Sequence, residues 1–239
     1  MYVCAHNLKV VESWTLGASS RTIVTPNYGD HIDYVIFDKD GYMYTNAHDK
    51  NLIRRYPPSS GTIVIGAGSS IGGSLNHPAG MAIDENYTLY VADQDNKRIL
   101  QWERNASSIV SVIDTSAVIS YPSALLISPT SANQLYISDE KGTAVYLWTT
   151  NTATPNTIFK TVTGGKNLNK PRGIKLDQYG NLYVADTENK RIVMFCVNST
   201  LGTIVVDSMP DKPADLAFDS NFNLYAILDS GVVSKHVLL

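Results

Sequence analysis

The stretch LNKPRGIKLDQYGNLYVADTENKRIVMF, residues 168–195, decides the fold because a near copy of it lies earlier in the chain. The copy, LNHPAGMAIDENYTLYVADQDNKRILQW, spans residues 75–102. Both contain Leu-Asn-x-Pro, Leu-Tyr-Val-Ala-Asp and Asn-Lys-Arg-Ile at matching offsets. Repetition on this scale indicates that one small structural unit is used several times along the chain.

The tyrosine of the Leu-Tyr-Val segment also marks weaker copies of the unit. Successive copies are 42, 46, 46, 47 and 42 residues apart, at Tyr2, Tyr44, Tyr90, Tyr136, Tyr183 and Tyr225. In five copies an aromatic residue follows twelve positions later, namely Trp14, Tyr56, Trp102, Trp148 and Phe195. This regular spacing predicts six repeats.

Each full repeat divides into four short strands separated by turns rich in Asp, Asn, Gly, Ser and Thr. Four-stranded units at a period of roughly 40 to 47 residues are typical of a β-propeller. We therefore expect an all-β, six-bladed β-propeller that forms one domain over residues 1–239. The first blade lacks its first strand and the last blade lacks its fourth. The predicted blades are 1–25, 31–68, 75–114, 120–164, 167–208 and 209–239.

The repeated pattern runs Pro-x-Gly-Ile/Met, Asp, Leu-Tyr-Val-Ala-Asp and Asn-x-Arg-Ile, and it resembles the NHL repeat. The resemblance covers nearly the whole chain and is strongest over 75–114 and 167–208. It implies four-stranded NHL-type blades. It does not imply one activity, because the family includes ubiquitin ligases that bind RNA, peptide-amidating lyases, and adhesion and signalling ectodomains.

Charge and hydropathy narrow the classes of partner. The net charge is -3 and the basic residues are scattered, whereas a nucleic-acid face needs clustered Lys and Arg, so we expect no nucleic-acid partner. No apolar run approaches the roughly 18 residues of a membrane span. The incomplete blades at 1–25 and 209–239 indicate either part of a longer chain or assembly, or a ring that closes with a depleted blade.

The candidate binding position is the residue after the proline of Leu-Asn-x-Pro, together with the residues that align with it in the other blades, because propellers bind ligands where these loops converge. This position holds Asp33, Ala79, Ser123, Arg172 and Ala214. We expect Arg172, Asp33 and Ser123, with Asp215 in the following position, to bind a protein or a glycan. The alternative is that these charges are solvated and hold no ligand.

The five histidines raise the question of a metal site. The family that the chain resembles includes amidating lyases, in which histidines follow the proline and converge on zinc. In this sequence that position holds no histidine. His31 aligns with His77 before the proline, and His6 aligns with His48 after the tyrosine strand. Such a pair could hold an ion loosely, but histidines of surface loops are the interpretation that we adopt. We therefore predict no metal ligand and no catalytic residue, and a structural calcium is the one cofactor left open.

Three further features bear on localisation and stability. Sequons at Asn86, Asn105 and Asn198 fall in predicted turns and favour a secreted glycoprotein. The repeated Asp93, Asp139 and Asp186 are expected to accept hydrogen bonds from the backbone of their own turns. Cys4 and Cys196 could pair or remain thiols.

Our functional hypothesis is a non-catalytic extracellular propeller that binds a protein or a glycan through one loop face. One alternative is a metal-dependent enzyme that resembles the amidating lyases or the lactonases. Another is an intracellular NHL module that binds RNA or protein.

Overall fold

The fold is all-β, as predicted. The computed structural model describes residues 2–15, 19–57, 63–65, 74–103 and 111–237. Strands hold 50% of the residues and helices 4%. The helices among the described residues are three short 3-10 turns, η1 (His6–Leu8), η2 (His48–Lys50) and η3 (Thr187–Asn189). In the described ranges no helix has the length and hydropathy that crossing a membrane requires.

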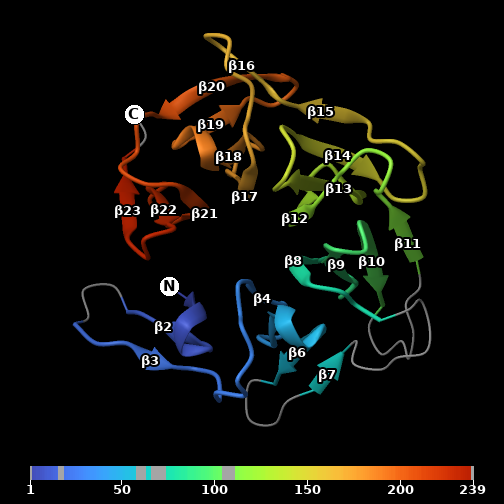
Figure 1. The fold of residues 1–239 in the computed structure, drawn as a ribbon, viewed down its shortest axis with the longest axis vertical. Helices are drawn as coiled ribbons and strands as arrows, with labels where there is room; N and C mark the ends of the chain where they lie inside the picture. The colour runs from blue at the N-terminus through green and yellow to red at the C-terminus, as the bar shows by residue number, and fades with distance from the viewer. Residues whose placement is uncertain (1, 16–18, 58–62, 66–73, 104–110, 238–239) are drawn as a thin grey trace. The chain divides into compact units, whose positions relative to one another are not determined.

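The chain divides into two compact units, an N-terminal unit Met1–Asp114 and a C-terminal unit Thr115–Leu239. The N-terminal unit contains three sheets whose paired strands are all antiparallel (Figure 1). The first sheet has three strands, β1 (Tyr2–Ala5), β2 (Val10–Ser13) and β3 (Thr22–Ile23). The second has β4 (Val35–Phe37), β5 (Met43–Ala47), β6 (Leu52–Tyr56) and β7 (Ile63–Ile65). The third has β8 (Pro78–Ile83), β9 (Leu89–Asp93), β10 (Arg98–Trp102) and β11 (Ser111–Asp114).

The C-terminal unit also contains three sheets. The first has β12 (Pro122–Ser128), β13 (Ser131–Asp139), β14 (Val145–Thr149) and β15 (Thr157–Phe159). The second has β17 (Pro171–Leu176), β18 (Leu182–Asp186), β19 (Arg191–Phe195) and β20 (Leu201–Val206). A short strand, β16 (Thr161–Val162), adds to β20 in parallel. The third sheet has β21 (Pro213–Phe218), β22 (Leu224–Leu228) and β23 (Val233–His236).

These sheets follow the predicted repeat pattern. In the part of the chain that is described, the first sheet lacks the strand that begins the other sheets and the last sheet lacks the fourth strand. The six-bladed ring and the single domain stay predictions.

The hairpin turn between the first and second strands owes its shape to one aspartate. The carboxylate of Asp177 accepts the backbone N–H groups of Tyr179 and Asn181, each at 2.9 Å. Asp38, Asp84 and Asp219 accept the N–H groups two and four residues ahead in the same way. Side chain-to-backbone bonds of this kind stabilise a turn at the expense of a continuing strand. The recurring aspartate therefore sets where each hairpin begins.

The tyrosine strand packs its aromatic ring into the core. Tyr183 is 5% exposed and meets Phe218 edge-on, with ring centroids 5.0 Å apart. Burial raises the pKa of both Tyr44 and Tyr183 to about 12. Tyr2 departs from this pattern, because it is 49% exposed although its ring centroid lies 4.6 Å from that of Phe37 in the next sheet.

The repeated aspartate at the end of the tyrosine strand has a structural role, but its partners differ from those expected. The carboxylate of Asp186 accepts a hydrogen bond from the backbone N–H of Asn169 at 2.7 Å, in the loop before the first strand of its own sheet. It also accepts one from the Arg191 guanidinium at 2.6 Å. Asp93 repeats this arrangement with Asn76 and Arg98. The aspartate therefore ties two loops of one sheet together.

Candidate functional site

The start of each first strand lies beside the end of each second strand, because the two strands are antiparallel. Pro78 pairs with Asp93, Pro171 with Asp186 and Pro213 with Leu228. Side chains that precede the first strand and side chains that follow the second strand therefore gather at one end of each sheet. We call this the loop end. The hairpin turns between the first two strands lie at the opposite end.

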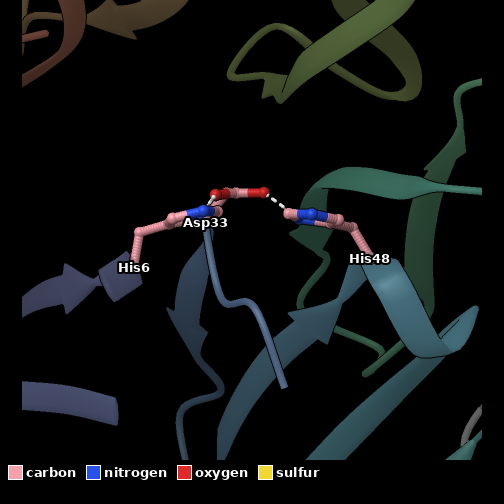
Figure 2. Close-up of side chains that lie close together, drawn as sticks. All are labelled: His6, Asp33 and His48. Carbon is pink, nitrogen blue, oxygen red and sulfur yellow. Dashed lines mark hydrogen bonds and ion pairs between the residues drawn. The ribbon is translucent and has the colours of Figure 1, made fainter. Parts of the chain in front are cut away.

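The loop end of the N-terminal unit carries a cluster of two histidines and a carboxylate (Figure 2). His6 lies in η1 and His48 in η2, and the Asp33 carboxylate lies between their rings. His6 Nδ1 is 2.8 Å from Asp33 Oδ1, and His48 Nδ1 makes a short contact with Asp33 Oδ2. One nitrogen or oxygen from each of the three residues lies within 4.8 Å of the other two.

Two more histidines surround this cluster. His31 Nδ1 lies 3.0 Å from His6 Nε2. The rings of His48 and His77 stack with centroids 4.6 Å apart and an interplanar angle of 2°. Four of the five histidines of the chain therefore gather here, with Asp33 between two of them. From the sequence we aligned these four histidines in pairs, but we interpreted them as separate histidines of surface loops.

Buried and charged neighbours hold the cluster in place. Asn46 is fully buried, and its side-chain oxygen accepts the backbone N–H of Asp33 at 2.9 Å. Its amide nitrogen donates to the carbonyl of Pro78 at 3.0 Å. Asp49 accepts the backbone N–H of His31 at 2.9 Å. Partial burial acts to raise the pKa of Asp49, but this hydrogen bond and nearby Lys50 outweigh it, so the pKa is lowered.

The loop end of the C-terminal unit carries ion pairs instead of histidines. Arg172 lies 3.2 Å from a carboxylate oxygen of Glu140 and 2.6 Å from one of Asp229, so it joins residues that follow β13 and β22. Lys212 and Lys170 lie 2.9 and 3.6 Å from Glu188. The hydrogen bond between Lys212 and Glu188 raises the pKa of the lysine and lowers that of the glutamate.

These charges line a shallow depression of about 240 Å³. Its lining residues come from all three sheets of the unit and their loops. They are Glu140, Lys141, Lys170, Arg172, Thr187, Glu188, Lys212 and Asp229.

The four predicted binding residues lie in different surroundings. Asp33 belongs to the histidine cluster, and Arg172 to the charged depression. Ser123 is 1% exposed within β12. Asp215 is half-buried in β21, and its backbone lies against Gly173. Whether these residues bind a ligand stays a prediction.

The other singled-out residues also have defined places. Asn86 and Asn198 are exposed, whereas Asn105 lies outside the described residues. Neither Cys4, which is half-buried, nor Cys196, which is exposed, forms a disulfide.

Comparison with known proteins supports the fold class. The family model of the NHL repeat matches residues 168–195, which confirms the resemblance seen in the sequence. The chain is thus a propeller-type protein that contains an NHL repeat. No curated protein matches it in sequence.

Several solved propeller structures are similar to the whole chain. A catalytically inactive virginiamycin B lyase from Staphylococcus aureus with quinupristin is 16% identical, with 97% of this chain and 78% of that chain covered and a TM-score of 0.72. A gluconolactonase from Xanthomonas campestris is 13% identical, with 93% and 77% covered and a TM-score of 0.73. A chain of the nidogen/laminin complex is 17% identical, with 95% and 84% covered and a TM-score of 0.75. At these identities the similarity establishes the fold alone.

Proposed function

We propose that this protein is a non-catalytic binding module that recognises a partner protein through the loop end of its C-terminal unit. One observation carries the proposal. Charges of both signs from three sheets converge around Arg172, in a depression that is open to solvent and too shallow to enclose a small molecule. Small-molecule sites are mostly apolar and span roughly 300–1,000 Å³, whereas this one is charged and about 240 Å³.

A protein partner fits this surface better than a glycan does. The lining alternates between cationic groups such as Arg172 and Lys212 and anionic groups such as Glu140 and Glu188. Charged groups on a partner protein can pair with both signs, which gives specificity and steers association. A chain of the nidogen/laminin complex is among the similar folds, which supports a protein ligand for this architecture.

The proposal places the protein outside the cell. Asn86 and Asn198 are exposed in turns after β8 and β19, where a glycan would meet no core side chain. Expression of the chain behind a secretion signal, followed by enzymatic removal of N-glycans, tests this point. We expect a mass decrease that is smaller for Asn86→Gln and for Asn198→Gln. A secreted chain without glycans would contradict this part of the proposal.

A metal-dependent enzyme is the second candidate, and the His6–Asp33–His48 cluster is the observation that favours it. Both a lyase and a gluconolactonase are among the similar folds. This candidate requires a bound ion and a substrate that is turned over, whereas the binding module requires neither.

Selection of displayed peptides on the immobilised full chain tests the binding module. The affinity of the selected peptides is then measured for the native protein and for two variants. Arg172→Glu reverses the central charge of the depression, and Lys160→Glu reverses an exposed charge outside it. We expect Arg172→Glu to weaken binding at least tenfold and Lys160→Glu to leave it unchanged. Equal binding to Arg172→Glu and the native protein would refute the assignment. A glycan array in parallel would reveal a glycan ligand instead.

A further inference from the structure

We propose that His6, Asp33 and His48 bind one divalent transition-metal ion of the zinc class. This site lies in the N-terminal unit and is independent of the proposed recognition by the C-terminal unit. It goes against the sequence-based expectation of no metal ligand. The inference rests on the three donor groups, their spacing, their accessibility and the residues that hold them.

The chemistry of the donors selects the kind of ion. Two imidazole nitrogens and one carboxylate oxygen suit zinc, iron and other ions that favour nitrogen ligands. Calcium and magnesium prefer sets made of oxygen ligands, and this cluster offers a single carboxylate, that of Asp33. Three protein ligands leave a coordination position for water or for a group of a partner molecule.

The spacing of the donors is close to that which an ion requires. A tetrahedral zinc ion with bonds of about 2.0–2.1 Å separates its ligand atoms by roughly 3.3–3.4 Å. Here His6 Nδ1 and Asp33 Oδ1 are 2.8 Å apart, and the donors of all three residues lie within 4.8 Å of one another. Small side-chain rotations suffice to accommodate the ion, because the three backbones already place their donors around one point.

The ion can reach the site without any opening of the fold. The side chains of His6, Asp33 and His48 are 46%, 37% and 16% exposed. The cluster lies at the loop end, where the Asp33 carboxylate is flanked by η1 and η2 (Figure 2).

Neighbouring residues orient the ligands. His31 Nδ1 lies 3.0 Å from His6 Nε2, so it can hold that ring by a hydrogen bond while His6 Nδ1 faces the ion. The side chain of Asn46 fixes the backbone of Asp33, and the ring of His77 stacks on that of His48. Metal-binding histidines characteristically use their other nitrogen in such a bond, and its loss typically weakens metal affinity by about 10–100-fold.

Titration of the full chain with zinc chloride, after removal of bound metal with a chelator, tests the proposal by calorimetry. We expect one ion per chain. Asp33→Asn and His48→Gln should each weaken zinc binding by more than the roughly 100-fold that marks the loss of an orienting residue, and His31→Gln by about 10–100-fold. His236→Gln is the matched control, because it removes a histidine of the C-terminal unit that contacts Ser234. It should bind as the native protein does.

Cobalt substitution gives a second readout that depends on the coordination itself. The native chain should develop the visible absorption of cobalt in a site with nitrogen ligands, and Asp33→Asn and His48→Gln should lose it while their circular dichroism is unchanged. No zinc binding by the native chain, or native affinity in both Asp33→Asn and His48→Gln, would overturn the assignment. Peptide binding by the C-terminal unit is measured separately, so either proposal can fail alone.

Discussion

The buried ion pair between Asp186 and Arg191 offers a sharp test of how the repeat is held together. Asp186 is fully buried, and the Arg191 side chain is 5% exposed. Besides the bond from Arg191, the carboxylate accepts bonds from the backbone of Asn169 at 2.7 Å and from the Asn189 side chain at 2.9 Å. Asp186→Ala removes all three acceptor contacts at once.

We expect Asp186→Ala to lower the free energy of unfolding by about 3–5 kcal/mol, because it leaves the buried guanidinium of Arg191 without its carboxylate. Domains are stable by about 5–15 kcal/mol, so such a loss is a large fraction of the total. Asp139 is the matched control at the same position of another sheet. It is 2% exposed, and its carboxylate accepts the backbone N–H groups of Ser120 and Tyr121. Asp139→Ala should cost about 1–3 kcal/mol, since it strands no buried cation.

Urea denaturation of the full chain, followed by circular dichroism, measures both losses. Addition of Arg191→Met to Asp186→Ala should recover part of the stability, because it removes the stranded charge and keeps an apolar stem. Equal losses for Asp186→Ala and Asp139→Ala, or no recovery in the double variant, would refute the reasoning.

Three further predictions concern the core and the close approach of two sheets. Tyr183→Ala should cost about 3–5 kcal/mol in a urea titration because it leaves a cavity beside Phe218, and a variant as stable as the native chain would contradict this. Gly173→Ala should cost about 1–3 kcal/mol, because the added Cβ would lie 2.5 Å from the Cα of Asp215 and 2.9 Å from the carbonyl oxygen of Ala214, both backbone atoms. Tyr44 and Tyr183 have pKa values of about 12 in the fold against an ordinary 10.0. The stability that they contribute is therefore fully present below pH 10.0 and is lost as the pH rises through about 12. Tyrosinate absorbance of the native chain should include groups that titrate near pH 12, and complete titration near pH 10 would contradict the burial.

The strands and hairpins could be predicted from the repeat, because equivalent residues form the same turn and the same strand in each copy. Asp177 and its counterparts mark the turn, and Tyr183 and its counterparts mark the buried second strand. Tyr2 did not follow, because it is 49% exposed although it contacts Phe37 of the next sheet, and the repeat alone does not determine how much of each ring its neighbours cover.

The histidine cluster could not be predicted from the sequence in the same way. Alignment paired His6 with His48 and placed Asp33 in the binding position. It could not show that these side chains point at one another, because that depends on how neighbouring sheets pack. Ser123 occupies the position that aligns with Asp33, but it is buried in β12, whereas the Asp33 side chain is partly exposed within the histidine cluster. Neighbouring sheets, rather than the repeat itself, determine what each loop position contacts.

The most direct test of the proposed recognition is hydrogen exchange of the full chain with and without a selected peptide. The account predicts slower exchange at the loop end of the C-terminal unit, in residues 140–142, 170–173, 187–190 and 211–213. Exchange in the hairpin turns at 177–181 and 219–223, at the opposite end of the same sheets, should not change. Protection confined to those hairpin turns would contradict the claim that the loop end binds the partner.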